Sequence, residues 1–258
     1  MVRWSVKRGG ETPGLLAAAT LLLTLSAEAA GVPSRAWPPL LGPREAFSPE
    51  LSAAIERVWL EPTLSRTVNG PVAHVPPRVY LAFVDTPEVT AAAARFKKLA
   101  SYEVQMLGDD RYRGDDGDGA RGIAQVLRRE GQRRVILSQG EHTSLFLGTI
   151  SGGALSILDL EQHGDSVEPV MTAYVHIDDR VAAALARALI SSFGFLADRK
   201  LAEGLRITAV VAEWAVDPSG GFCEWLAAEP IPAARRAPIM AALPACARGV
   251  AQSGDAIR

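Results

Sequence analysis

The sequence predicts an α+β domain in which a mixed sheet is packed with helices. Segments with strand composition alternate along the chain with segments of helical periodicity. The chain has 258 residues, of which 48% are hydrophobic and 22% are charged. A chain of this length and composition can bury a full-sized core, so we expect one globular domain.

The first 29 residues have the pattern of a cleavable signal peptide. Arg3, Lys7 and Arg8 form a positively charged start, and Leu15–Leu25 is an apolar run that ends shortly before the small-x-small motif Ala27–Ala29. The run is shorter than the roughly 20 residues that span a bilayer, so an uncleaved membrane anchor is the weaker alternative. We therefore expect a periplasmic or secreted protein with no stable membrane span after cleavage.

Residues 30–47 contain four prolines and are expected to form an extended linker. Residues 48–258 are expected to form the single globular domain, with a C-terminal extension that carries a disulfide. Its first helix begins at Ser48, with Ser48 as N-cap and Pro49 at the first helical position, and runs to about Leu60.

The next elements follow from composition and turn residues. The β-branched and aromatic residues of 78–84 predict a strand, and Asp85–Glu88 predicts the start of a helix that runs to about Ser101. A short strand is expected at 103–107. The later expectations are a polar loop at 108–119, a helix at 120–130, a strand at 134–137, a strand pair at 143–150 and 154–160 turned by Ser151–Gly153, and a strand at 169–177.

A helix is expected to follow that last strand. Asp178 and Asp179 are suited to its N-terminus, an apolar stripe gives it a core-facing side, and Gly194 is expected to end it. A final strand is expected at 206–215 and helical structure at 231–248.

Cys223 and Cys246 are the only cysteines. In an oxidising compartment they predict a structural disulfide that closes a segment of 24 residues. A reactive thiol or metal ligands are the alternatives. Neither cysteine belongs to a CxxC motif, and no histidine lies within 40 residues of either, which favours the disulfide.

Charge and motifs exclude several classes of function. The formal net charge is −2 and aromatic residues make up 6% of the chain, so nucleic-acid binding is not expected. The sequence has no Rossmann or Walker glycine loop, and we expect no cofactor. The acidic loop at 108–119 lacks the EF-hand spacing, and His74, His142, His163 and His176 lack the i, i+4 spacing of a zinc helix, so we expect no metal and no catalytic residue.

The stretch 176–198, HIDDRVAAALARALISSFGFLAD, has the rhythm of a zinc-peptidase helix without its ligands. Arg187, Ala188 and Ser191 stand where such a helix carries His, Glu and His. The chain resembles uncharacterised bacterial exported proteins that look like degenerate zincins. The resemblance rests on these residues, on the stretches AYVHIDD and ALISSFGF, and on the strand-helix-strand start at 78–107. The resemblance implies a zincin-like fold whose catalytic chemistry has been lost.

We therefore interpret the chain as a non-catalytic exported protein whose cleft binds an unknown peptide, glycan or envelope protein. The expected ligand-binding residues are Arg187, Ser191, His176 and Tyr174. Two alternatives stay open. One is a periplasmic zinc or serine hydrolase assembled from separated residues, namely His142, His163, His176, Asp165 and Ser151, and the other is a structural subunit of an envelope assembly.

Overall fold

The structure is a computed structural model that describes residues 36–108, 110–144, 148–188 and 190–246. All of them belong to one compact unit, Arg35–Arg258. The predicted signal peptide, with its cleavage position after Ala29, lies outside the described residues. Within the described ranges, no helix is both long and apolar enough to cross a membrane.

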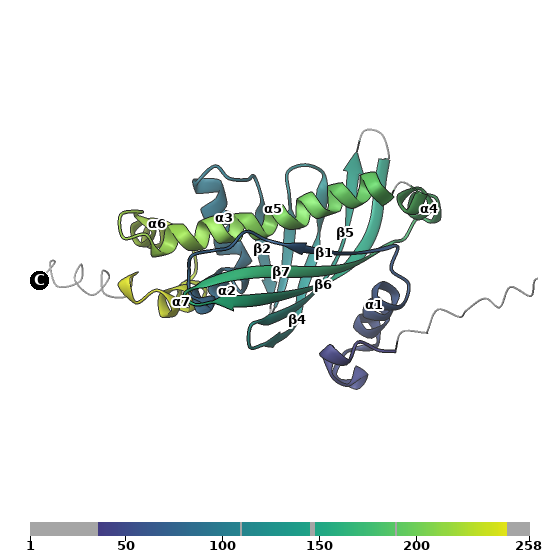
Figure 1. Ribbon diagram of the computed structural model, residues 1–258, viewed down its shortest axis with the longest axis horizontal. Coiled ribbons are helices and arrows are strands. Elements are labelled where there is room, and N and C mark those ends of the chain that lie inside the picture. Colours follow the sequence, from purple (N-terminus) through teal and green to yellow (C-terminus); the bar gives the residue numbers. More distant parts are fainter. Residues whose placement is uncertain (1–35, 109, 145–147, 189, 247–258) are drawn as a thin grey trace, which may run out of the picture. The chain divides into compact units, whose positions relative to one another are not determined.

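A seven-stranded sheet forms the centre of the fold, with strand order β1-β7-β6-β5-β4-β3-β2 (Figure 1). The strands are β1 (Leu64–Asn69), β2 (Glu103–Gly108), β3 (Arg111–Asp115), β4 (Ala120–Glu130), β5 (Arg133–Ser144), β6 (Gly148–His163) and β7 (Ser166–Ile177). Every pairing between these described strands is antiparallel. The α+β class is confirmed, whereas the expected mixed sheet was wrong.

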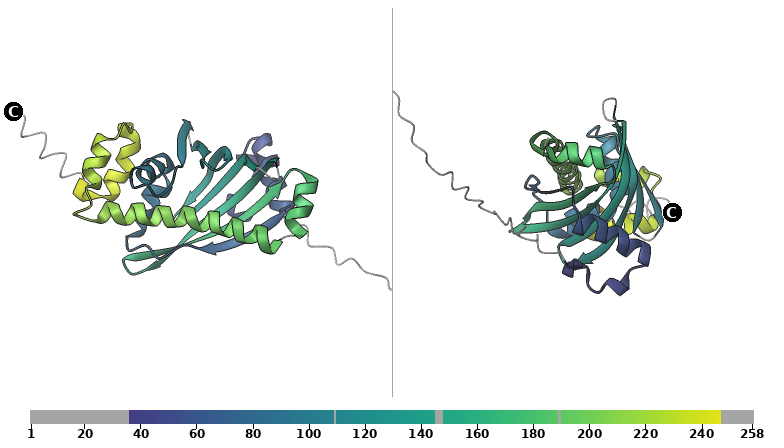
Figure 2. Two further views of the ribbon diagram at one scale, coloured as in Figure 1. Left: turned by 90° about the horizontal axis from the view of Figure 1, so that it is seen from above. Right: turned by 90° about the vertical axis from the view of Figure 1, so that its right-hand side faces the viewer.

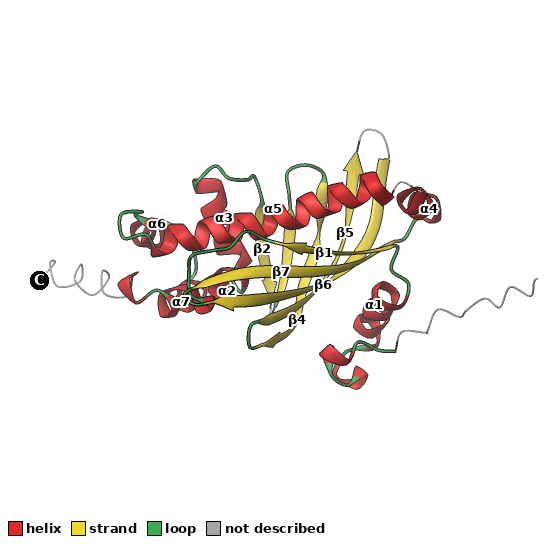
Figure 3. Cartoon of the chain, in the orientation of Figure 1, coloured by secondary structure: helices red, strands yellow, loops and turns green. Residues whose placement is uncertain are grey.

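The helices lie on both faces of the sheet and at one end of it (Figure 3). They are η1 (Pro39–Leu41), η2 (Arg44–Ala46), α1 (Pro49–Leu60), α2 (Pro77–Val84), α3 (Pro87–Phe96), α4 (Arg180–Ala188), α5 (Ile190–Val216), α6 (Phe222–Ala228) and α7 (Ala233–Ala242). The long helix α5 runs along the concave face of the sheet, and α1 lies on the opposite, convex side (Figure 2). The two sides therefore have separate cores.

The convex side is covered by the N-terminal segment. As predicted, Ser48 caps α1: its Oγ accepts a hydrogen bond from the backbone N–H of Leu51 at 3.3 Å. Ile55 and Val58 of α1 pack with buried side chains of β5 and β6. Part of the expected extended linker joins this core instead, because η1 and η2 turn the chain and Leu41 is buried at 4% exposure.

On the concave side, the larger core fills only one end of the sheet. It gathers side chains from α2, α3, α6, α7 and the C-terminal half of α5 against β6 and β7. Its members include Tyr80, Phe83, Leu158, Leu160, Leu205 and Phe222. The hydroxyl of Tyr80 donates to the carbonyl oxygen of Leu205 at 3.2 Å, so α2 and α5 are joined inside this core.

A buried ion pair connects the α2–α3 corner to the sheet. The guanidinium of Arg134, on the concave face of β5, is 7% exposed and donates two hydrogen bonds of 2.7 Å to the carboxylate of Asp85. Arg129 of β4 donates a third hydrogen bond to Asp85, at 3.0 Å. Since a buried charge without a partner is strongly destabilising, this geometry fixes where the helical end meets the strands.

Five sequence-based expectations were wrong for the same reason, namely that tertiary packing overrides local composition. The segment 78–84 forms α2 rather than a strand, since Pro77 starts a helix whose Val79 and Phe83 are buried. The segment 120–130 is β4, and 206–215 belongs to α5, which continues through Gly194 without ending there. Ser151–Gly153 is not a turn but lies inside β6.

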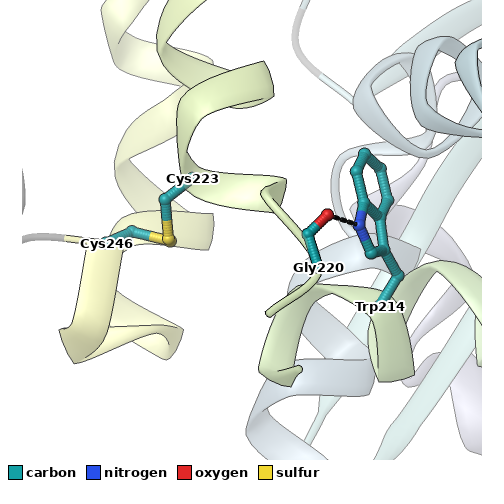
Figure 4. Close-up of a disulfide and its surroundings, with 4 residues drawn as sticks. All are labelled: Trp214, Gly220, Cys223 and Cys246. Carbon is teal, nitrogen blue, oxygen red and sulfur yellow. Dashed lines mark hydrogen bonds between the residues drawn. A yellow bond between two sulfur atoms is a disulfide. The ribbon is translucent and has the colours of Figure 1, made fainter. Parts of the chain in front are cut away.

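The expected disulfide is present. Cys223 of α6 and Cys246 are joined by an S–S bond of 2.05 Å (Figure 4). It ties α6 to the chain after α7. Nearby, the indole N–H of Trp214, near the end of α5, donates to the carbonyl oxygen of Gly220 and so holds the turn that leads into α6.

Removing the disulfide should lower the free energy of unfolding. Replacing both cysteines with serine (Cys223→Ser with Cys246→Ser) should cost about 3 kcal/mol, because the unfolded chain then regains the freedom of a loop closed over a separation of 23 residues. Urea unfolding followed by tryptophan fluorescence measures the loss. A reductant should destabilise the native protein and leave the double variant unchanged; equal effects on both would contradict the prediction.

Candidate functional site

Four glycines cross the concave face of the sheet side by side. The strand register pairs Gly114 of β3 with Gly122 of β4, Gly122 with Gly140 of β5, and Gly140 with Gly152 of β6. We call these four residues the glycine row. It continues to Ile177 of β7, which pairs with Gly152. Across four neighbouring strands, this row therefore has backbone and no side chains.

Three of these positions have no room for a side chain. A Cβ on Gly122 would lie 2.4 Å from the carbonyl oxygen of Gln139, and one on Gly140 would lie 2.3 Å from that of Arg121. A Cβ on Gly152 would lie 2.3 Å from the carbonyl oxygen of His176. Glycine within a strand marks a bend or a close approach of backbone, and here it lets neighbouring strands meet where the sheet curves.

A cavity of about 650 Å³ lies over the glycine row. Small or apolar residues line it on one side of the row: Ala124, Ser138, Ala154 and Val175, which pair with one another across β4 to β7. Residues of mixed character line it on the other side: Tyr102, Asp116, Ala120, His142 and Ile150. The cavity is thus apolar toward the centre of the sheet and polar toward its rim.

Helix α5 is held over this cavity by ion pairs to both sides of the sheet. Asp198 lies 3.5 Å from the guanidinium of Arg66 on β1. Lys200 lies 3.2 Å from the carboxylate of Asp116 and 3.1 Å from that of Asp118, in the turn between β3 and β4. Lys200 itself lines the cavity, so we call the Lys200–Asp116–Asp118 contact the rim clamp.

The surroundings change the acidity of the rim groups. Burial alone would raise the pKa of Asp116, but N–H donors of Ala120 and Asp118, together with Lys200, hold the pKa of this carboxyl below its usual value. Burial would likewise lower the pKa of Lys200, yet its bonds to Asp118 and Asp116 raise it. Burial, with Glu203 nearby, raises the pKa of Tyr102 to about 12. At neutral pH, Asp116 and Lys200 are therefore charged and the phenol of Tyr102 is neutral.

The structure separates the four residues expected to bind a ligand. His176 borders the cavity with its backbone, between Val175 and Ile177, while its side chain lies on the same face of β7 as Tyr174, with Nδ1 2.7 Å from the carbonyl oxygen of Glu61. Tyr174 lies on the convex side, where its ring packs edge-on against Trp59 at 4.6 Å. Arg187 belongs to α4 and Ser191 to α5, and their side chains lie outside the described part of the structure.

The residues of the hydrolase alternative do not gather in one place. His142, Ser151 and His176 line the cavity. His163 is at the far end of β6, where its Nε2 lies 3.9 Å from the carboxylate of Glu168. Among the described residues, no three His, Cys, Asp or Glu side chains are arranged to hold a metal ion. The acidic loop instead forms β3 and a turn that Asp116 stabilises through backbone N–H groups.

The comparisons with known proteins yield structural matches only. No family model matches the chain, and no curated protein matches it. A solved structure of the Mll3558 protein from Rhizobium loti is 17% identical with a TM-score of 0.38, covering 58% of this chain and 96% of that one. A conserved protein from Geobacillus kaustophilus is 18% identical with a TM-score of 0.38, covering 58% of this chain and 93% of that one. Ara h 8.0201 is 11% identical with a TM-score of 0.39, covering 58% of this chain and 98% of that one.

These TM-scores are all below 0.5, so the fold of this chain follows from its own strand order and helices. An antiparallel sheet that curves around one long helix is a helix-grip arrangement, and β1 to β7 with α5 have it. The zincin resemblance was therefore wrong. Its strand-helix-strand start at 78–107 is two helices followed by a strand, and Arg187 and Ser191 lie on different helices rather than on one.

A side chain on the glycine row should disturb the sheet only where the backbone is close. Gly140→Ala should lower the free energy of unfolding by about 1–3 kcal/mol, because its Cβ meets the backbone of β4. Gly114→Ala is the matched control, since a Cβ there has no atom within 4 Å, and it should stay within about 0.5 kcal/mol of the native protein. Urea unfolding measures both; equal losses would contradict the assignment.

The rim clamp should give a stability difference that depends on pH. Because the folded-state pKa of Asp116 is lowered, its charge stabilises the fold above the unfolded-state pKa of about 3.9, and this contribution disappears as pH falls through the lower folded-state value. Asp116→Asn should therefore cost about 0.5–1 kcal/mol at pH 7 and progressively less below pH 4. Unfolding in urea across this pH range tests it. Asp118→Asn, at a carboxyl that is 73% exposed, should cost less; a pH-independent difference for Asp116→Asn would contradict the prediction.

Proposed function

We propose that this protein binds an apolar small molecule in the cavity between the glycine row and α5. The observation that carries the proposal is the cavity itself, with a volume of about 650 Å³, within the range of small-molecule sites. It lies on the same concave face that is filled by side chains at the other end. One half of that face is therefore core, and the other half is open space with a lining of similar apolar character.

The composition of the lining favours an apolar ligand. The four glycines expose backbone carbon, and Ala124, Ala154, Val175 and Ile177 add apolar side chains. Transfer of apolar ligand surface from water to such a lining contributes roughly 25 cal/mol per Å². The rim clamp sets one ammonium against two carboxylates, so the only lysine in the lining is already paired and is not available to an anionic ligand.

The proposal replaces the cleft of the zincin interpretation with a cavity of limited size, about 650 Å³, that is open to solvent on one side. A small molecule fits such a site better than the peptide, glycan or envelope protein that the sequence suggested. Arg187 and Ser191 are kept as candidate contacts, since α4 begins shortly after Ile177 at the edge of the cavity, and His176 is kept only through its backbone. The disulfide supports an exported protein that meets its ligand in an oxidising compartment.

Binding can be tested with N-phenyl-1-naphthylamine, an uncharged probe whose fluorescence rises in apolar surroundings. We expect saturable binding with one probe per chain. Ala154→Leu places a larger side chain beside the glycine row and should weaken binding about tenfold or more by filling space that the probe needs.

Ser65→Leu is the matched control, because it adds a leucine at an exposed position on the convex side of β1. It should leave the dissociation constant unchanged. Circular dichroism confirms that both variants are folded. Absence of saturable binding to the native protein, or equal weakening by the two leucines, would count against the proposed function.

A further inference from the structure

Resting on the proposed function, we infer that the ligand is a flat, rigid ring system with one oxygen-bearing group directed at Ser138. Two independent features of the cavity lead to this class of ligand. One is the shape of the floor under the ligand. The other is a single hydroxyl group placed beside that floor.

The floor carries no side chains because it consists of glycine backbone. Neighbouring strands lie about 4.8 Å apart, so the four strands of the glycine row span roughly 14 Å, and successive rows on one face are about 6.7 Å apart. No side chain rises from Gly114, Gly122, Gly140 or Gly152 over this area. A strip of this size matches the face of several fused rings, which can contact the backbone over their whole area.

A flexible chain would gain less from the same floor. Apolar chains are best held where side chains surround them, and each rotatable bond that becomes fixed on binding costs conformational entropy. A rigid ring system loses almost none of this entropy. A flat face can contact the bare strip of backbone over its whole area, whereas a coiled chain contacts it at fewer points.

Ser138 supplies the polar contact. It lies on β5 between Ala124 and Ala154, one row from the glycines, and it lines the cavity. Its hydroxyl has no hydrogen-bond partner among the residues that the structure describes. A half-buried hydroxyl in apolar surroundings discriminates in favour of a ligand that completes its hydrogen bond. A hydroxyl or carbonyl group at the edge of the ring system would do so.

Displacement of N-phenyl-1-naphthylamine by pyrenol, pyrene and dodecanol tests this inference. Pyrenol is flat with one hydroxyl, pyrene is flat without one, and dodecanol is a flexible chain with a hydroxyl. The native protein should bind pyrenol at least tenfold more tightly than dodecanol. Ser138→Ala should weaken pyrenol roughly fivefold and leave pyrene unchanged.

Gly114→Val tests the floor, because its Cβ has free space and the fold should tolerate it. It should weaken both flat compounds and leave dodecanol nearly unchanged. Ser65→Ala, which removes an exposed hydroxyl from the convex side of β1, is the control and should change nothing.

The outcomes separate this inference from the proposed function. If dodecanol binds as tightly as pyrenol, or if Ser138→Ala weakens pyrene and pyrenol equally, the ligand class is wrong while the apolar site stands. If the probe binds but none of the three compounds displaces it, the ligand class is wrong; if the probe itself does not bind, the proposed function fails as well.

Discussion

The close approach of β4 and β5 at Gly122 and Gly140 is the constraint on which the rest of the structure depends. Each residue lies where a side chain would strike the backbone of the other strand. Only glycine allows the sheet to bend in this way, and the bend makes one face concave. Helix α5 crosses this concave face and forms ion pairs with β1 on one side and with the β3–β4 turn on the other. The cavity is the space that remains between the bent sheet and the helix.

The concave face of the sheet has two ends: one is packed with side chains and stabilises the fold, and the other borders the cavity. At the first, aromatic and aliphatic side chains of α2, α5, α6 and α7 pack against the sheet, and the disulfide holds the last helices in place. The ion pair between Arg134 and Asp85 joins the α2–α3 corner to the strands. Stability is thereby concentrated away from the cavity, which frees the other end from the demand for dense side-chain packing.

Local signals in the sequence predicted part of this fold. Ser48 and Pro49 predicted α1 because capping depends on neighbouring residues, and the disulfide followed from having only two cysteines. The segments that became α2 and β4 were assigned wrongly because their partners are distant in sequence. The glycine row was invisible for the same reason: its members are far apart along the chain and meet only through strand register. Ser138 carried no signal, since an isolated serine in a strand is common.

The cavity has an apolar lining and, at its edge, the rim clamp. These two parts respond to different properties of the solution. The contacts of Lys200 with Asp116 and Asp118 lie near solvent, where dissolved ions screen charges over about 8 Å at physiological salt. The glycine-rich walls respond instead to temperature through the heat capacity of apolar hydration. Salt therefore weakens the ion pairs that hold α5 to the sheet, whereas temperature changes the apolar contribution to the proposed binding. The two contributions can therefore be varied separately in solution, one by salt and the other by temperature.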